Sequence, residues 1–421
     1  MKIGQAPRGR EGVFAHYYTI LYYYETFNKI FLRVFGILNS ELKRVGASSR
    51  NFFHRSSAIL FPSLAIRGKK IDVPIVQGGM GVGISLFPLA AAVAREGGLG
   101  IISSAGLDLL VSRRKGKRVN SYEAAYEEVS LAKESGGQHV GINIMVALAR
   151  DYEESVKGAI DAGADVIISG AGLPLGLPLI RPSGPSGETA LIPIVSSARA
   201  LEVVCRKWEK AGRRPDAAVL EGPLAGGHLG FKIDELDMES NRLENLLPAV
   251  KDVALKHGDF PIIVAGGIYS HTDIARFLLM GASGVQMGTR FLATEESGAS
   301  HEYKQAVVSA KKEDMLVAHN PGSPCGLPFR VIRQSPMFAS ALKRLRAPKC
   351  DKGYVLQRDP AGKFTRCPAK QDNENYFCIC NGLLSSAGYD TAEEPLFTAG
   401  TNACRVDRIL SVHDLMEELK H

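Results

Sequence analysis

The sequence predicts a (β/α)8 barrel with a helical arm at its N-terminus and a cysteine-bearing extension at its C-terminus. Two observations carry this prediction. Eight short apolar runs, rich in β-branched residues, recur between residues 73 and 289, and most precede a stretch with the composition of a helix. Glycine and polar residues gather where the runs end. Because the chemistry of such barrels lies at the carboxyl ends of the strands, a functional site is expected there.

The eight runs are almost continuously apolar, as strands buried on both faces must be. They are VPIVQ (73–77), LGIISS (99–104), HVGINIM (139–145), DVIISG (165–170), LIPIVSS (191–197), DAAVLE (216–221), PIIVAGG (261–267) and SGVQMGT (283–289). Helices are expected over 86–96, 122–134, 152–162, 198–210, 246–257 and 271–280. Gly163 and Gly281 are placed to end two of these helices. A doubly wound sheet uses the same units and is the alternative fold.

Composition indicates a soluble globular protein, since 45% of the 421 residues are hydrophobic. The net charge of +7 is uneven. Residues 1–58 carry nine Lys and Arg against three Asp and Glu, which leaves a balance of +1 for the rest of the chain. A nearly neutral body argues against a nucleic-acid footprint. Nucleic acid is therefore not expected as a partner, and a small-molecule substrate is.

The N-terminal arm, residues 1–58, is basic and rich in aromatic residues. Glu25, Lys29 and Arg33 interrupt its apolar stretch at helical spacing, and no run of 18 uncharged apolar residues occurs, so no transmembrane segment is expected. Two interpretations stay open. The arm is either an amphipathic helix that packs on the body or on a partner subunit, or a targeting or interfacial segment. Both a monomer and a homodimer are compatible with the sequence.

Six of the seven cysteines follow residue 320. An odd number in a large α/β chain argues against a secreted disulfide framework and favours a reducing, cytoplasmic compartment. Cys350, Cys367 and either Cys378 or Cys380 are candidates for a metal or iron–sulfur site, although no clean C-x-x-C pair is present. Free or redox-labile thiols are the alternative. The chain ends in SVHDLMEELK, which predicts an amphipathic helix capped by Ser411.

Glycines follow the first strand in QGGMGVGIS (77–85), with a spacing that invites a dinucleotide interpretation. A nicotinamide site of the Rossmann type also needs an acidic residue at the end of the second strand, which here reads ISSAG. The Rossmann interpretation is therefore disfavoured. The stretch instead predicts a backbone that a flat ligand can approach closely, because glycine lacks a Cβ atom.

The seventh and eighth strands end in VAGGI (264–268) and QMGT (286–289). In barrels the loops after these two strands commonly bind phosphate. Exposed N–H groups of Gly266, Gly267, Gly288 and Thr289, with the Thr289 hydroxyl, are suitable donors for a phosphate group. Glycines that merely turn the chain are the alternative, but two such loops at these two strands favour phosphate binding.

Two polar residues complete the candidate site. Asn143 interrupts the apolar strand GINIM, where its amide can offer a donor and an acceptor; a bond to the neighbouring loop is the structural alternative. His228 follows two glycines in EGPLAGGHLGF (221–231), so a flexible backbone carries the ring into the mouth. Because histidine ionises near neutral pH in water, the ring is suited to proton transfer.

The motifs PIVQGGMGVGIS, GINIM, EGPLAGGHLGF, PIIVAGGI and GVQMGTRFLATEES occur in this order over about residues 62–335. Together they resemble the nitronate monooxygenase family, which is similar to the flavin-dependent enoyl-acyl-carrier-protein reductases. The resemblance implies a TIM barrel at 59–335 with non-covalent FMN, and leaves 1–58 and 336–421 outside the core. It implies His228 as the catalytic residue beside the flavin. The implied FMN contacts are Gln77, Gly78, Gly79, Met80, Asn143, Glu221, Gly226, Gly227, Gly266, Gly267, Gln286, Met287, Gly288 and Thr289.

The activity that the resemblance implies is the oxidation of alkyl nitronates with O2 to a carbonyl compound and nitrite. An NAD(P)H-dependent flavin reductase of enoyl thioesters is the alternative enzyme, and a non-catalytic flavin-binding protein is the alternative of another class. The chain departs from the family pattern at Leu224, where relatives usually have Glu, and at Glu221, where Gln is common. These departures point to the substrate end of the site as the place where this chain differs.

Overall fold

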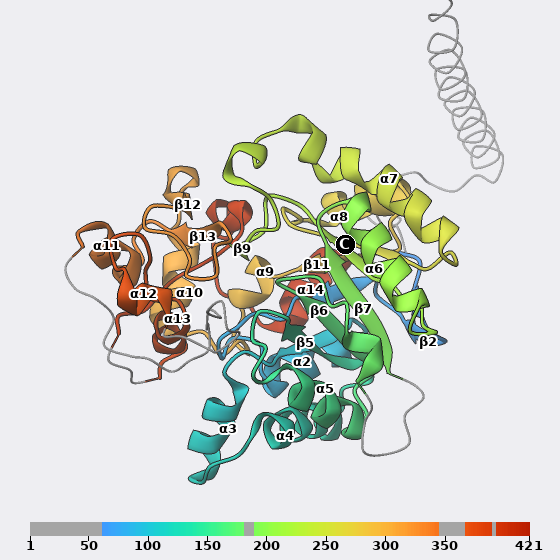
Figure 1. The fold of residues 1–421 in the computed structure, drawn as a ribbon, viewed down its shortest axis with the longest axis horizontal. Helices are drawn as coiled ribbons and strands as arrows, with labels where there is room; N and C mark the ends of the chain where they lie inside the picture. The colour runs from blue at the N-terminus through green and yellow to red at the C-terminus, as the bar shows by residue number, and fades with distance from the viewer. Residues whose placement is uncertain (1–60, 181–188, 345–366, 390–392) are drawn as a thin grey trace, which may run out of the picture. The chain divides into compact units, whose positions relative to one another are not determined.

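The computed structural model describes residues 61–180, 189–344, 367–389 and 393–421. The predicted arm at 1–58 and Cys350 lie outside these residues. Eight parallel strands, all of them predicted, form the centre of the fold (Figure 1). They are β3 (Ile75–Gln77), β4 (Gly100–Ser103), β5 (Val140–Met145), β6 (Val166–Gly170), β7 (Ala190–Val195), β8 (Ala218–Glu221), β10 (Ile262–Ala265) and β11 (Gly284–Met287).

The sheet closes on itself. Its order is β3-β11-β10-β8-β7-β6-β5-β4, and a parallel bridge between Val76 and Leu99 joins β3 to the beginning of β4. The (β/α)8 barrel is therefore confirmed, and the doubly wound alternative is wrong, because an open sheet would leave β3 or β4 at an edge.

The six predicted helices are present, each within three residues of its expected ends. They are α2 (Phe87–Arg95), α4 (Ser121–Glu134), α5 (Tyr152–Asp161), α6 (Ala198–Glu209), α7 (Leu243–Lys256) and α8 (His271–Leu279). Local signals explain their ends. Ser270 caps α8 by accepting from the Asp273 N–H, and Gly163 and Gly281 follow α5 and α8 with φ of +76° and +90°. The sequence did not indicate α3 (Leu107–Lys115), a short helix whose polar and apolar residues are not segregated.

A hairpin of β1 (Leu64–Ile66) and β2 (Lys69–Ile71) closes the amino-terminal end of the barrel. Leu64, Ile66 and Ile71 are almost fully buried and pack with the strand residues that fill the barrel interior, among them Leu99 and Val166. The larger core lies outside, between the sheet and the helices. Because the hairpin fills one end, a ligand site is left for the carboxyl end of the strands.

The chain after the barrel adds a second layer of structure around the carboxyl end. Its elements are α9 (Thr289–Leu292), α10 (His301–Val308), β12 (Met315–Ala318), β13 (Phe329–Ile332), α11 (Pro336–Leu342), α12 (Pro368–Gln371), α13 (Cys380–Ser386) and α14 (Val412–Lys420), with the 3-10 turns η4 (Lys312–Asp314) and η5 (Thr401–Arg405). Earlier 3-10 turns are η1 (Leu177–Leu179), η2 (Ile233–Glu235) and η3 (Glu239–Asn241). The predicted C-terminal helix is α14, capped by Ser411 as expected.

A small antiparallel sheet links this layer to the barrel. The two-residue strand β9 (Gly227–His228) pairs with β13, so that His228 lies opposite Phe329 and Gly227 opposite Arg330 (Figure 1). The loop that the sequence marked as flexible is thus held by regular hydrogen bonds at its histidine.

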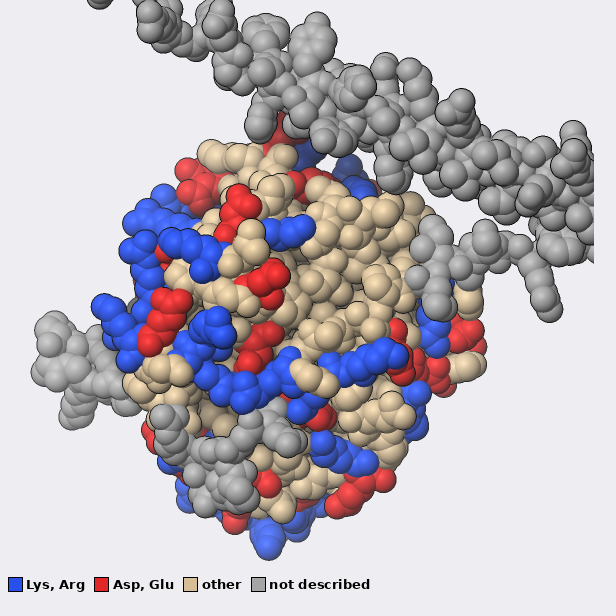
Figure 2. All heavy atoms as spheres, turned by 90° about the vertical axis from the view of Figure 1, so that its right-hand side faces the viewer, with Lys and Arg blue, Asp and Glu red and all other residues tan. Residues whose placement is uncertain are grey.

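The surface agrees with the nearly neutral body. Figure 2 shows basic and acidic side chains interspersed on one face, beside a broad uncharged area, instead of one basic field. None of the helices in the described ranges is both long and apolar enough to cross a membrane.

Candidate active site

A cavity of about 510 Å³ lies at the carboxyl end of the strands. Its wall joins the loop after β3, the ends of β5, β8, β10 and β11, the β9 strand and residues from the C-terminal layer. Every predicted site residue except Gln77 lines it. They are Gly78, Gly79, Met80, Asn143, Glu221, Gly226, Gly227, His228, Gly266, Gly267, Gln286, Met287, Gly288 and Thr289.

Gln77 is fully buried in the barrel wall and does not line the cavity. Its amide nitrogen donates to the Ser85 hydroxyl at 2.8 Å and to the Gly78 carbonyl at 2.5 Å, while its amide oxygen accepts from the Ile101 N–H at 3.0 Å. This side chain joins the loop after β3, called here the first loop (residues 78–85), to β4. A contact between its backbone and a cofactor stays a prediction.

Asn143 faces the cavity from β5 and is 9% exposed. A Cβ atom at Gly79 would lie 2.3 Å from the Asn143 Cβ, so the close approach of the first loop to Asn143 itself requires glycine there. In the described part of the chain the Asn143 amide makes no side-chain hydrogen bond, which leaves its donor and acceptor available to a ligand.

Glu221 and Gln286 occupy one row of the barrel, because β8, β10 and β11 align Glu221 with Ala265 and Ala265 with Gln286. The amide oxygen of Gln286 is buried and has no hydrogen-bond partner. Burial raises the pKa of Glu221 to about 7. This wall therefore presents an unsatisfied acceptor and a carboxyl group that holds its proton to neutral pH.

The predicted phosphate end is built by the loops after β10 and β11. Gly266 and Gly267 have φ of +94° and +85°. The Thr289 hydroxyl oxygen accepts from the Gly400 N–H at 2.9 Å, so its hydrogen remains for a ligand. The Asn402 amide donates to the Gly267 carbonyl at 2.5 Å. Sequence reasoning missed the C-terminal residues 398–402, since no motif marks them.

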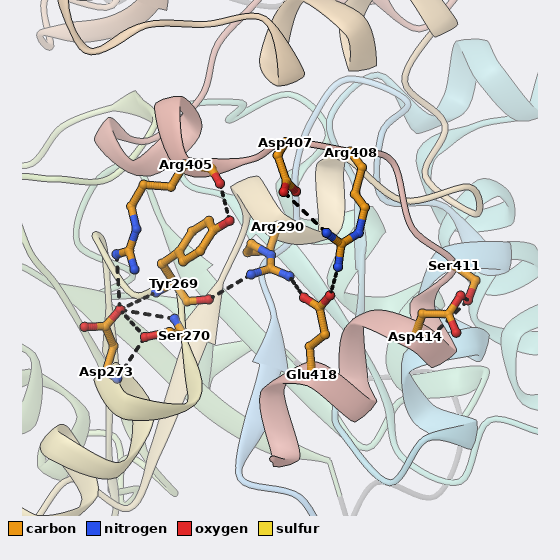
Figure 3. A network of polar contacts seen from close by, with 10 residues as sticks. All are labelled: Tyr269, Ser270, Asp273, Arg290, Arg405, Asp407, Arg408, Ser411, Asp414 and Glu418. Carbon is orange, nitrogen blue, oxygen red and sulfur yellow. Dashed lines mark hydrogen bonds and ion pairs between the residues drawn. The ribbon is translucent and has the colours of Figure 1, made fainter.

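A polar network ties the C-terminal layer to this end of the cavity. Figure 3 shows the Tyr269 ring flanked by two guanidinium groups, with Arg290 4.4 Å and Arg405 4.0 Å from the ring centroid. Arg290 donates to Glu418 on α14 at 2.5 Å, and Arg405 lies 3.6 Å from Asp273. Tyr269 and Arg290 also line the cavity. The network therefore fixes the loops after β10 and β11 against the C-terminal helix.

His228 lines the same cavity from β9. Its ring packs edge-on against Phe329, with centroids 4.7 Å apart, and its Nε2 lies 3.4 Å from the Ser323 hydroxyl. Ser323 in turn lies 2.8 Å from the Cys325 sulfur. Burial alone would raise the pKa of the Cys325 thiol, but the hydrogen bond and charge of His228, with Ser323, lower it to about 7. Ser323 and Cys325 belong to NPGSPCGLPFR (320–330), a stretch that the sequence marked only as turn-rich.

Arg330 is a second residue that the sequence did not indicate. It is 5% exposed on β13, and it donates to the carbonyl oxygens of Pro223, at 2.8 Å, and Ala225. Burial lowers the pKa of Arg330 to about 10. Its guanidinium group thus holds the loop that leads into His228.

In the described ranges the cysteines do not form a group with metal-ligand spacing. The one group of possible ligand atoms found among the described residues belongs to Glu96, His413 and Glu417, whose atoms all lie within 4.8 Å of one another. Lys420 lies 3.5 Å from Glu96 and 3.0 Å from Glu417, so these carboxylates already have a cation. The cysteine site that includes Cys350 stays a prediction.

Comparison with known proteins identifies the family. A family model described as nitronate monooxygenase matches residues 63–421, which includes the cavity and the C-terminal layer. The chain belongs to the nitronate monooxygenase family. The match runs past residue 335, where the resemblance seen in the sequence ended. As a member of this family, the chain is a flavin-dependent oxidoreductase.

Individual relatives of this family member differ in their names. The chain is 30% identical over 296 residues, covering 70% of this chain and 72% of the relative, to a (3aS,4S,5R,7aS)-5-hydroxy-7a-methyl-1-oxo-octahydro-1H-indene-4-carboxyl-CoA dehydrogenase of Mycobacterium tuberculosis. It is 28% identical to a probable nitronate monooxygenase of Staphylococcus haemolyticus, covering 59% and 72%. Among solved structures, FabK from Thermotoga maritima is similar, with 27% identity, coverage of 83% and 92% and a TM-score of 0.58.

The cavity of this family member fits a flavin. The unsatisfied oxygen of Gln286 needs an N–H donor, and the protonated carboxyl of Glu221 needs an acceptor; the polar edge of a flavin ring offers both kinds of group. The turn at Gly266 and Gly267, with the Thr289 hydroxyl, is suited to a phosphate group. The donor set therefore agrees with a ring at one side of the cavity and a phosphate at another.

Proposed function

We propose that the chain is an FMN-dependent nitronate monooxygenase that oxidises alkyl nitronates with O2 to a carbonyl compound and nitrite. The observation that carries this proposal is the meeting of His228 with the row of Glu221 and Gln286 around one cavity. Family membership supports the reaction class, and the turn at Gly267 with Thr289 supports a cofactor that ends in a phosphate.

FMN, when bound, supplies a ring that takes electrons from the substrate and makes them available to O2. The chain's own residues hold and orient it. Gly267 and Thr289 receive its phosphate, and Asn143, Glu221 and Gln286 offer hydrogen bonds to the ring. The first loop, at Gly78 to Met80, forms the wall against which a flat ring can lie.

His228 serves the substrate. In its charged form the ring attracts and orients the nitronate anion, and in its neutral form it takes the proton from the α-carbon of a neutral nitroalkane. The overall reaction balances as two nitronate anions and one O2 giving two carbonyl molecules and two nitrite ions. Each carbon gains one oxygen atom and loses nitrogen as nitrite.

The test has two steps. The flavin released from purified protein is identified by mass, and FMN is the expected species. The loaded protein is then mixed with propyl-2-nitronate without O2, where the flavin absorbance is expected to bleach, and with O2, where nitrite and acetone are expected in equal amounts. A flavin that stays oxidised in the anaerobic mixture overturns the proposed activity.

A second candidate is an NAD(P)H-dependent flavin reductase of enoyl thioesters. Two observations favour it: a 30% identical relative is named as a carboxyl-CoA dehydrogenase, and the cavity wall includes the apolar residues Leu148, Leu224, Leu327 and Leu383. Leu224, which stands where family members usually carry Glu, is 46% exposed at this wall. Anaerobic addition of NADPH separates the two candidates, because the nucleotide rapidly bleaches the flavin absorbance only if the chain is the reductase.

A further inference from the structure

The contacts of the Ser323 hydroxyl connect His228 to a cysteine that no proposed step uses. The hydroxyl oxygen lies 3.4 Å from the Nε2 atom of His228, 2.8 Å from the sulfur of Cys325 and 3.3 Å from the Cys325 N–H. Ser323 and His228 line the cavity. The His228 ring also forms a side-chain hydrogen bond with Cys325. Nε2 is the ring nitrogen on the Ser323 side, and Nδ1 is the nitrogen left to face a ligand.

A serine hydroxyl has one hydrogen to donate and two acceptor positions. The Cys325 N–H takes one acceptor position in either case. A neutral thiol donates into the other, so the hydroxyl hydrogen points to Nε2 and the ring proton resides on Nδ1. A thiolate can only accept, so the hydroxyl donates to sulfur and accepts from a proton on Nε2. Both arrangements satisfy the hydroxyl completely.

We propose that Cys325 is a positioning residue whose thiol, acting through the Ser323 hydroxyl and through its own contact with the ring, decides which ring nitrogen of His228 carries the proton. With the thiol neutral, Nδ1 presents an N–H to the cavity. With the thiolate, Nδ1 presents a lone pair and can accept a proton from a ligand. The inference deepens the proposed role of His228 and rests on it only for the consequence in turnover.

The surroundings support this assignment. The pKa of the Cys325 thiol is lowered to about 7, so the thiol and the thiolate are both populated near neutral pH. His228 is the titratable group with the largest effect on this pKa. The other titratable groups near this wall have other partners or do not bond to His228. Arg330 binds the Pro223 and Ala225 carbonyls and interacts with Asp237, exposed His319 lies 3.3 Å from the Val317 carbonyl, and Glu221 and Cys380 line the same cavity without a hydrogen bond to His228.

The first test reads the tautomer directly. The full-length protein, labelled with 15N-histidine, is compared with Cys325→Ser by NMR at pH 8.5, and the His228 signals are assigned with His228→Asn. The native protein is expected to carry the ring proton on Nε2. The serine variant, whose hydroxyl does not ionise, is expected to carry it on Nδ1. The same tautomer in both proteins overturns the inference, whether or not the chain oxidises nitronates.

The second test uses no cysteine variant and compares the native protein with His228→Asn. Alkylation of the Cys325 peptide by iodoacetamide is followed by mass spectrometry, with the exposed Cys404 as the internal control. Loss of His228 is expected to slow alkylation of Cys325 at pH 7 on the order of 10-fold, as its thiolate fraction falls to that of an ordinary thiol. Cys404 is expected to react unchanged. Equal Cys325 rates in the two proteins overturn the thiol–imidazole coupling.

Discussion

Two parts of the cavity wall, called here the phosphate end and the histidine end, are built in different ways. The phosphate end comes from the loops after two adjacent strands, β10 and β11, and its groups are backbone turns and the Thr289 hydroxyl, which do not titrate near neutral pH. The histidine end joins His228 to Ser323, 95 residues away along the chain, and places a thiol of lowered pKa beside them. The backbone and hydroxyl donors of the first part do not titrate near neutral pH, whereas the thiol of the second part does. This division is suited to a protein that keeps one cofactor and turns over a substrate.

Among the variants considered, replacing His228 with Gln is expected to have the largest effect, and it tests whether the two parts of the cavity act separately. If the two ends act separately, turnover falls by about 100-fold to 10,000-fold, the range for removing a general acid or base, while bound flavin per chain is unchanged. Steady-state nitrite release and the flavin absorbance of the same sample measure the two quantities. A variant that loses its flavin together with its activity would show that the ends are not independent.

Glu221 lines the same cavity from β8, and its raised pKa gives a sharper test. The folded value of about 7 lies above the unfolded value of 4.5, so the native state retains a proton that the unfolded chain loses between these pH values. Its contribution to stability is therefore complete below pH 4.5 and is lost as pH rises through 7, by about 3 kcal/mol. Glu221→Gln is expected to remove this decline, measured by denaturant unfolding of flavin-free protein at pH 5 and pH 8. An identical decline in the variant contradicts the burial argument.

The same contrast explains how far the sequence could predict the structure. The strands and the glycine loops were predictable, because apolar runs buried on both faces and glycines at strand ends are local patterns. The contact predicted for Gln77 is one of its backbone with the cofactor and stays a prediction, whereas the structure shows that its side-chain amide binds the Ser85 hydroxyl and the Ile101 N–H inside the barrel wall. A sequence motif identifies the residue type at a position, but it does not show which group that side chain contacts in the folded protein.

The histidine end was only half predictable. His228 stood out by type and by its glycine neighbours, whereas Ser323, Cys325 and Arg330 occur in a turn-rich stretch without periodicity. Their roles arise from the pairing of β9 with β13, a contact between segments about 100 residues apart. Residues 398–402 were missed for the same reason. Such long-range contacts leave no local pattern in a single sequence.

Gly267→Ala probes the phosphate end and has the smallest expected effect. At φ +85° a Cβ atom is strained, and it would lie 2.8 Å from Cδ1 and 2.9 Å from Cβ of Leu224. Shifting this turn by the amount needed to relieve the contact misplaces the phosphate donors. FMN affinity is therefore expected to fall about 10-fold, equivalent to about 1.4 kcal/mol, in a titration that follows the quenching of flavin fluorescence.

Gly163→Ala is the matched control, because Gly163 has a φ of +76° and open space where its Cβ would stand, far along the chain from the cavity loops. Both variants are expected to lose about 1 kcal/mol of unfolding free energy through backbone strain, but only Gly267→Ala is expected to lose FMN affinity. The apparent KM for nitronate in fully loaded Gly267→Ala is measured as well, because the turn at Gly267 contacts Leu224, the residue at which this chain departs from the family pattern. Equal FMN affinities in the two variants would place the phosphate elsewhere in the cavity, and a raised KM would mean that the turn at Gly267 also positions the substrate.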